Sequence, residues 1–119
     1  MVSLEMDGPY KLDNETIDAI VTRTSCAGNY ALERRQEEGS FIVNYVGRSD
    51  DDVKGRLKYW IERKPYYKRF KFSYTSSGRA AFEKECKNYH DFGGSEKLDN
   101  EIHPQRPEGT NWSCPICDY

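Results

Sequence analysis

One stretch of this 119-residue chain decides how the rest is organised: residues 45–57, which read YVGRSDDDVKGRL. The residues before it, from Ser40 to Val46, are mostly apolar, β-branched or aromatic, which predicts a buried strand that Gly47 ends. Ser49 and the three aspartates at 50–52 then supply an N-cap and an acidic first turn for a helix. We therefore expect a strand and a helix to meet at this corner.

The helix after the corner is predicted to run from about Asp50 to Arg63, where Pro65 stops it. Its apolar residues recur at helical spacing: Val53, Leu57, Trp60 and Ile61. Arg56 then lies on the helix and Tyr45 on the strand, at the same corner. A tyrosine hydroxyl beside an arginine guanidinium suits the binding of a phosphate. The alternative is that both side chains are structural, the tyrosine at a strand edge and the arginine along the helix surface.

The composition indicates one domain, residues 1–119, with a modest core. The apolar fraction is 36%, below the usual range of roughly 45–50%, but nine Tyr, five Phe and two Trp compensate because aromatic rings bury much area. The formal net charge of -2 gives no overall indication of nucleic acid binding. No apolar run approaches the ~20 residues of a membrane span, and the first residues lack the features of a signal peptide. We expect a soluble, cytoplasmic protein that does not contact a membrane.

The residues before the corner predict an arm, a helix and a hairpin. Residues 1–11 are expected to be irregular, and Asp13 or Asn14 to cap a short helix. This helix places three apolar residues on one side: Ile17, Ile20 and Val21. Gly28 to Arg34 predicts the first strand, and the polar turn 35–40 joins it to the second strand as an antiparallel hairpin.

The residues after the corner predict a third strand and a third helix. Phe70 to Thr75 alternates between apolar and polar residues, as strands with one buried face do. Ser76 or Ser77 caps a helix from about Arg79 to His90, whose inward residues are Ala81, Phe82, Cys86 and Tyr89. This order of elements indicates an α+β fold, with a small three-stranded antiparallel sheet flanked by helices.

Residues 54–71 are locally basic, with eight Lys or Arg against Glu62 alone, and aromatic residues are interleaved with them. Basic side chains bind phosphates and aromatic faces stack on bases, so this composition suits a nucleic-acid groove. The alternative is a solvated helix face that runs into a basic loop. The residues predicted to bind nucleic acid are Lys54, Lys64, Lys68, Arg69 and Lys71.

Together these pieces resemble the GIY-YIG nuclease superfamily. Gly28-Asn29-Tyr30 stands where the family has Gly-Ile-Tyr, and Tyr45-Val46-Gly47 is close to Tyr-Ile-Gly. Arg56 follows at about the family's distance, on the helix after the second motif. Residues 81–89 resemble the helix that carries the metal-binding glutamate, and Asn100 resembles the asparagine that closes the site.

The resemblance covers about residues 26–104 and has three departures. The middle residue of the first motif is Asn29, which is polar where the family has an aliphatic residue. Such a residue would point outward if Tyr30 and Leu32 set the inner face of the strand. The hairpin turn is longer than usual, and one extra residue separates the second motif from the arginine. None of these departures removes a functional side chain.

The resemblance implies hydrolysis of phosphodiester bonds with Mg²⁺ or Mn²⁺ as cofactor. It assigns the metal to Glu85, with Glu83 as the alternative, and phosphate stabilisation to Arg56. It makes Tyr30 the base and Tyr45 the group that positions water or phosphate. A tyrosine of pKa ~10 is a poor base unless the arginine or the metal lowers its pKa. We expect the catalytic set to line one concave face of the sheet: Tyr30, Tyr45, Arg56, Glu85 and Asn100.

The tail, residues 105–119, is loop-rich and contains one Cys-x-x-Cys pair, Cys114 and Cys117. One such pair is half a zinc site, and zinc is therefore a candidate cofactor. The residues available to complete the site are Cys26, Cys86, His90 and His103. The alternative for Cys86 and His90 is a core residue and a surface histidine. A redox pair is disfavoured because no thioredoxin-like βαβ pattern surrounds the cysteines.

Three functions are compatible with these patterns. The first is a metal-dependent endonuclease acting on DNA, with RNA as the alternative substrate. The second is a non-catalytic module on the same fold that binds nucleic acid or protein. The third is a zinc-stabilised interaction domain in which the tyrosines and the arginine are structural. All five positions of the family's catalytic set are filled, which favours the enzyme.

Overall fold

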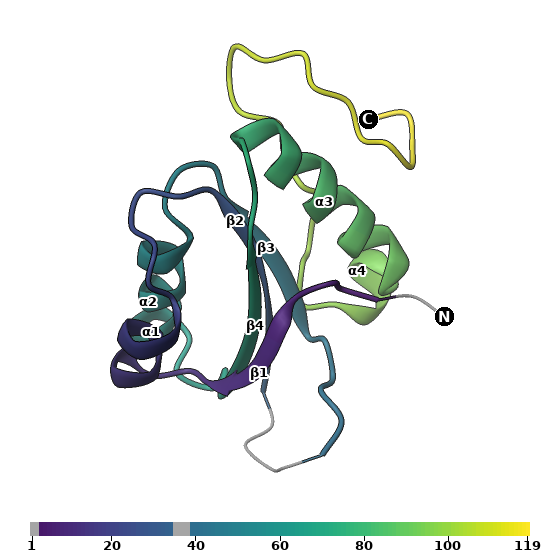
Figure 1. Cartoon of the computed structure of the whole chain (residues 1–119). Coiled ribbons are helices and arrows are strands. Elements are labelled where there is room, and N and C mark those ends of the chain that lie inside the picture. Colours follow the sequence, from purple (N-terminus) through teal and green to yellow (C-terminus); the bar gives the residue numbers. More distant parts are fainter. Residues whose placement is uncertain (1–2, 35–38) are drawn as a thin grey trace.

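A four-stranded antiparallel sheet forms the centre of the computed structural model, which describes residues 3–34 and 39–119 (Figure 1). The strands lie in the order β1-β4-β2-β3 and are β1 (Asp7–Lys11), β2 (Gly28–Glu33), β3 (Tyr45–Ser49) and β4 (Arg69–Tyr74). Helices α1 (Asn14–Ile20) and α2 (Val53–Arg63) cover one face of the sheet, and α3 (Gly78–Asp91) and the short α4 (Gly94–Lys97) cover the other. The chain is therefore a small α+β domain, with four strands where the sequence predicted three.

The additional strand is β1, which lies in the segment 1–11 that we expected to be irregular. That prediction was wrong because Gly8 and Pro9 normally argue against a strand. An edge strand tolerates a proline, since one side of its backbone needs no partner. β1 lies at the edge and pairs with β4 alone, with a register irregularity between Asp7 and Tyr10.

The second predicted strand is displaced along the chain. Residues 40–44 lie outside any strand, and β3 begins at Tyr45 and continues through Gly47 to Ser49. Gly47 therefore does not end the strand but pairs with Tyr30 of β2. A Cβ atom at this position would overlap the ring and hydroxyl of Tyr30, so glycine is needed beneath that ring. The strand was predicted too early because residues 40–44 are largely apolar. Two of them, Phe41 and Val43, pack on the core from a loop.

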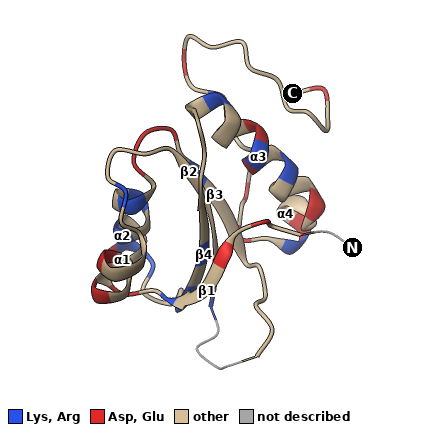
Figure 2. Cartoon of the chain, in the orientation of Figure 1, with Lys and Arg blue, Asp and Glu red and all other residues tan. Residues whose placement is uncertain are grey.

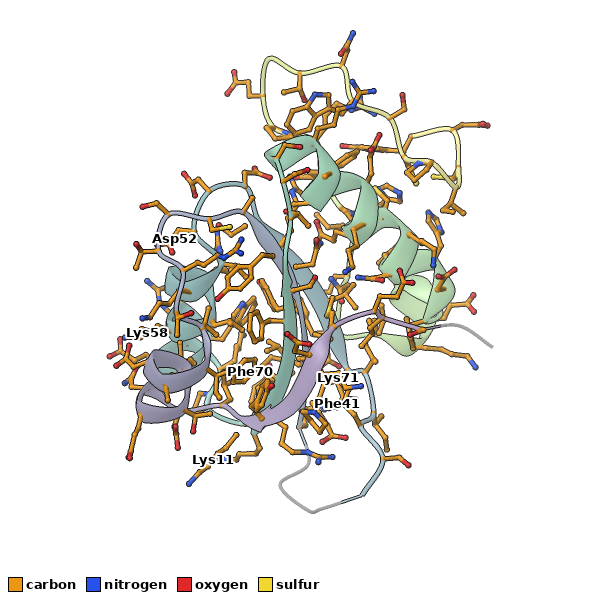
Figure 3. All side chains as sticks on the ribbon, in the orientation of Figure 1. Lys11, Phe41, Asp52, Lys58, Phe70 and Lys71 are labelled. Atoms are coloured by element: carbon orange, nitrogen blue, oxygen red, sulfur yellow. The ribbon has the colours of Figure 1, made fainter. Side chains whose placement is uncertain are left out.

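Alternation along the strands divides the core into two layers. Tyr30 and Leu32 face α1 and α2, whereas Ala31 and Val46 face α3 and α4. Figure 3 shows the same alternation on β4, where Phe70 points toward α1 and α2. Its neighbour Lys71 points to the other face, with its Nζ 5.3 Å from the ring centre of Phe41.

Asn29 follows this alternation and lies on the face opposite Tyr30, but it does not reach solvent. It is fully buried beneath α3, and its Nδ2 donates a hydrogen bond to the carbonyl oxygen of Ala81 at 2.9 Å. The outward orientation that we expected was wrong because helices cover both faces of the sheet at this strand. Here the polar residue anchors the first turn of α3 to the sheet.

The helix boundaries agree with the sequence to within a few residues. Each of the three long helices is capped by a side chain that accepts a backbone N–H bond: Asp13 for α1, Asp52 for α2 and Ser77 for α3. α2 ends at Arg63, two positions before Pro65, as predicted. No helix within residues 3–34 and 39–119 has the length and apolar character to cross a bilayer.

Candidate active site

Both tyrosine motifs contribute to a cavity of about 360 Å³ beside strand β3. Four of the five predicted catalytic residues line it: Tyr30 from β2, Tyr45 from β3, Arg56 from α2 and Glu85 from α3. The other lining residues are Gly47, Arg48, Ser49, Asp50, Asp51 and Trp60.

We expected the catalytic set to line one face of the sheet, but it does not. α2 and α3 lie on opposite faces of the sheet (Figure 1). Arg56 on α2 and Glu85 on α3 therefore reach the cavity from opposite faces. They meet because β3 is the last strand of the sheet and the cavity lies around its edge. The site therefore lies at an edge of the sheet, and helices on both faces contribute side chains to it.

A second cavity of about 260 Å³ adjoins the first and shares Tyr45, Arg48 and Glu85 with it. Its remaining wall is the segment from Asn100 to Gln105. Asn100 lines this second cavity and not the first. Its Oδ1 accepts from the amide of Val46 at 3.0 Å, and its Nδ2 donates to the carbonyl of Val46 at 2.8 Å. Because both ends of this amide are used, Asn100 fixes the loop along the β3 edge rather than facing a substrate.

Tyr30 is buried, and its hydroxyl accepts a hydrogen bond from Nε1 of Trp60 at 2.7 Å. Burial, followed by the neighbouring Tyr45, raises the pKa of Tyr30 well above its usual value, although Trp60 and Arg56 oppose the shift. The base role inferred from the family resemblance requires a lowered pKa. The folded chain instead holds Tyr30 in its protonated form.

Tyr45 stacks beside Tyr30, with 6.4 Å between ring centres, and packs on Trp60 at 4.8 Å. Burial and then the charge of Glu85 raise the pKa of Tyr45 to about 12. Its hydroxyl is therefore a hydrogen-bond donor at neutral pH, which suits a group that positions water or a phosphate oxygen.

Glu85 forms an ion pair that the sequence did not predict. Nη1 of Arg48 lies 2.5 Å from Oε1 of Glu85, and Nε of Arg48 lies 2.8 Å from Oδ1 of Asp50. Nη2 of Arg48 donates to the carbonyl oxygen of Gln105 at 2.7 Å. Burial raises the pKa of Glu85, and the guanidinium of Arg48 opposes that shift.

Sequence reasoning missed Arg48 because the strand was ended at Gly47. With β3 extended to Ser49, alternation places Arg48 on the same face as Val46, which is the face that α3 covers. Applying the two-residue period of a strand as far as Ser49 would have placed Arg48 on the face that α3 covers. The alternative metal ligand, Glu83, is instead paired with Arg79 at 3.5 Å and lines neither cavity.

Arg56 is exposed and stacks over the ring of Tyr59, 5.2 Å from its centre. Within residues 3–34 and 39–119 it has no ion-pair partner. Its guanidinium is therefore available to an anionic ligand. This contrasts with Arg48, whose three nitrogens are all bonded within the protein.

The basic residues predicted to bind nucleic acid line neither cavity. Lys54 is paired with Asp18 at 3.4 Å, and Arg69 with the buried Glu33 at 2.5 Å. Figure 2 shows Lys and Arg on both sides of the sheet rather than gathered on one surface. The other three predicted residues, Lys64, Lys68 and Lys71, lie at the end of α2 and on or before β4.

Mg²⁺ keeps several waters and needs only one or two carboxylates besides a substrate phosphate. Glu85 uses Oε1 for Arg48, and within the described part of the chain its Oε2 has no partner. Three carboxylates and two guanidiniums line the first cavity, so its walls carry net negative charge, which favours a cation. The residues present fit Mg²⁺ or Mn²⁺ held at Glu85.

Cys114 and Cys117 line neither cavity and lie near the end of the tail, where His90 and His103 join them. His103 also belongs to the wall of the second cavity. Cys86 packs in a small cluster with Phe82 and Cys114. Cys26 lies outside this His/Cys group.

No family model matches the chain, and no curated protein or solved structure matches it.

Proposed function

We propose that this chain is a metal-dependent endonuclease that hydrolyses phosphodiester bonds in DNA, including structured or branched DNA, with RNA as the alternative substrate. One observation carries the proposal. Four residues that a sequence pattern alone singles out come from four separate elements and line one cavity. The cofactor is Mg²⁺ or Mn²⁺ at Glu85, and it would supply charge neutralisation on the phosphate oxygens and activation of water.

The side chains around the cavity divide the remaining work. Arg56 is exposed and has no ion-pair partner among the described residues. Its guanidinium binds the phosphate and stabilises the charge that develops on it. Tyr45 keeps its proton at neutral pH and donates a hydrogen bond to a phosphate oxygen or to the attacking water. Tyr30 also keeps its proton, so we assign it a donor's role in place of the base.

The ion pair between Arg48 and Glu85 favours a second candidate, a non-catalytic module that binds nucleic acid. Arg48 occupies one oxygen of the carboxylate that the enzyme needs for its metal. In this alternative Glu85 orients Arg48, and the cavity binds phosphate groups without cleaving them. Protein binding by the same fold is supported by no feature of the cavity.

A cleavage assay on linear DNA, branched DNA and RNA, with Mg²⁺, Mn²⁺ or a chelator, separates the two candidates. We expect metal-dependent cleavage that falls ~10²–10³-fold in Arg56→Ala, as for loss of an electrostatic stabiliser. Arg63→Ala is a matched control because both arginines stack on Tyr59, at 5.2 and 4.9 Å, and only Arg56 lines the cavity. Wild-type protein that binds these substrates without cleaving any of them would establish the binding module. Equal losses in the two variants would show that the cavity is not the site.

A further inference from the structure

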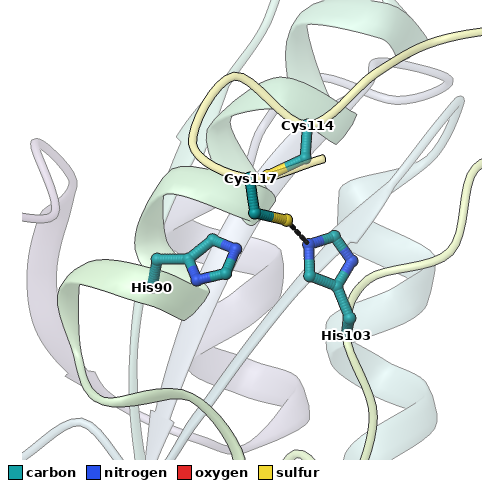
Figure 4. Close-up of side chains that lie close together, drawn as sticks. All are labelled: His90, His103, Cys114 and Cys117. Carbon is teal, nitrogen blue, oxygen red and sulfur yellow. Dashed lines mark hydrogen bonds between the residues drawn. The ribbon is translucent and has the colours of Figure 1, made fainter. Parts of the chain in front are cut away.

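Four side chains with metal-binding chemistry gather between α3 and the tail (Figure 4). His90 lies on the last turn of α3, His103 lies in the loop after α4, and Cys114 and Cys117 come from the tail. One ligand atom from each of them lies within 4.8 Å of all the others. Three segments that are separate in the sequence therefore present two sulfur and two nitrogen donors to one point.

The spacing of these donors suits a tetrahedral ion. Zn–S bonds of about 2.3 Å and Zn–N bonds of about 2.0–2.1 Å place tetrahedral ligand atoms about 3.3–3.8 Å apart. Sγ of Cys117 and Nε2 of His103 lie 3.4 Å apart, within this range (Figure 4). The 4.8 Å limit on the other pairs requires only small side-chain rotations to reach it.

The hydrogen bonds around the cluster prepare the donors for a metal. Nδ1 of His103 lies 2.7 Å from the carbonyl oxygen of Pro104, and because a carbonyl can only accept, Nδ1 carries the proton. The lone pair of His103 is then on Nε2, which faces Cys117, as in metal sites where the second ring nitrogen donates to a carbonyl. Nε2 of His90 is buried without a hydrogen-bond partner in the described part of the chain. A buried ring nitrogen without a partner is costly unless something binds it.

Cys114 is prepared in the same way. The amide of Ile116 points at its Sγ, 3.4 Å away, which favours a sulfur that carries negative charge. Two thiolates and two neutral imidazoles balance the charge of a divalent ion, so the site adds no net charge to the buried surface of α3. Soft sulfur with imidazole in a tetrahedral set selects zinc over Mg²⁺ or Ca²⁺.

We propose that His90, His103, Cys114 and Cys117 bind one structural Zn²⁺ ion. The set is closed, with four protein ligands and no position for substrate, as structural zinc sites are. It is independent of the metal proposed at Glu85, which takes oxygen ligands. Cys86 and Cys26, the other two cysteines, are not ligands.

The ion would fasten one wall of the second cavity to α3. His103 and Gln105 belong to that wall, and the carbonyl of Gln105 accepts from Arg48, the partner of Glu85. Trp112 and Tyr119 of the tail also pack on Phe82 of α3, with ring centres 6.2 and 6.4 Å from that of Phe82. The ion would thereby stabilise residues 98–119, which form no helix or strand.

Metal analysis of the full chain, expressed in zinc-supplemented medium and purified without chelator, tests the site. We expect about one zinc per chain in the wild type and in the Cys26→Ser and Cys86→Ala controls, and less than about a tenth of that in Cys117→Ser or His103→Ala. Iron in place of zinc, no bound metal at all, or loss of zinc in Cys86→Ala with retention in Cys117→Ser would overturn the proposal.

Thiol alkylation of the unmutated protein gives a readout that does not depend on variants folding. Cys117 is exposed, yet a zinc-bound thiolate is protected, so a strong chelator should accelerate its alkylation roughly tenfold or more. Cys26, half-buried and outside the cluster, serves as the internal control and should react at the same rate with and without chelator. Equal rates at Cys117 in the two conditions, or a disulfide between Cys114 and Cys117 in the native protein, would exclude the zinc site.

Discussion

Two buried glutamates lie on the α3 side of the sheet, and each is bonded to an arginine at 2.5 Å: Glu33 to Arg69, and Glu85 to Arg48. Glu33 is completely buried, and its second oxygen accepts from the amide of Ile42 at 2.5 Å. Glu85 is 7% exposed and lines both cavities. The same pair of residue types is thus used once inside the fold and once at a cavity wall.

The arginines differ as well. Arg48 also bonds Asp50 and the carbonyl of Gln105, so it keeps strong partners if Glu85 changes. In the described part of the chain, Arg69 has weaker further contacts: two backbone carbonyls at 3.4 Å and the ring of Phe41, whose centre lies 5.8 Å from its guanidinium carbon. The difference teaches that a buried ion pair is structural when both oxygens of the carboxylate are bonded inside the protein and the arginine has no second carboxylate partner in the described residues. It is available for chemistry when one partner is held independently and an oxygen of the other faces a cavity.

The largest expected change in folding free energy comes from Glu33→Gln. It removes the one charged partner that Arg69 has among the described residues, and breaking a buried pair in this way costs about 3 kcal/mol. Urea unfolding measures the loss. Glu83→Gln is the control, because its exposed pair with Arg79 contributes no more than about 0.5 kcal/mol. Equal stability of the two variants would remove the distinction between the buried pair and a surface pair.

Gly47→Ala tests whether packing holds open the cavity beside Glu85. The added methyl group would overlap the ring and hydroxyl of Tyr30, and overpacking of this kind costs about 2 kcal/mol. Gly78→Ala, at the start of α3, should change stability by less than about 1 kcal/mol, since the nearest atom would lie 3.3 Å away. Should Gly47→Ala prove as mild as Gly78→Ala in urea unfolding, Tyr30 is not held against the strand as described.

Glu85→Gln should lower the free energy of unfolding by no more than about 1 kcal/mol. Arg48 remains paired with Asp50, and the amide oxygen of the new residue can still accept a hydrogen bond. A loss as large as that of Glu33→Gln, measured in the same urea titration, would show that both glutamates are structural and would end the comparison.

The smallest effect is on alkaline stability. The pKa of Tyr45, about 12 in the folded chain against an ordinary value of 10.0, owes its rise first to burial and next to Glu85. The folded pKa is the higher one, so the stabilisation is complete below pH 10 and is lost as the pH rises toward 12. Glu85→Gln should make this loss less steep and Glu33→Gln should leave it unchanged, in urea unfolding at stepped pH. If the pH dependence of stability changes equally in the two variants, the charge of Glu85 does not affect the pKa of Tyr45.

The sequence predicted most of the elements and four of the lining residues, for physical reasons that can be named. Helical period, acidic caps and Pro65 located α2, and the tyrosine motifs located β2 and the start of β3. These signals are local, so one stretch of chain contains them. β1 was missed because its glycine and proline are tolerated only at a sheet edge, and a sequence does not show where the edge will be.

The ion-pair partner of Glu85 and the neighbours of the cysteines depend on tertiary structure. Arg48 meets Glu85 only because β3 continues past Gly47 and α3 crosses that face. His90 and His103 were candidates among four, and nothing short of the packing of the tail on α3 selects them over Cys26 and Cys86. The protonated state of Tyr30 likewise follows from its burial, which no local pattern reveals.

We propose that the cavity at the β3 edge hydrolyses phosphodiester bonds with a metal at Glu85. The most direct test compares Mg²⁺-dependent cleavage of branched and linear DNA by Glu85→Gln and Glu33→Gln, at a temperature where both are folded. We expect Glu33→Gln to cleave at the wild-type rate per folded molecule, and Glu85→Gln to bind DNA normally but cleave ~10²–10³ times more slowly. Cleavage by Glu85→Gln at the wild-type rate, or loss of cleavage in Glu83→Gln instead, would contradict the assignment of the metal to Glu85.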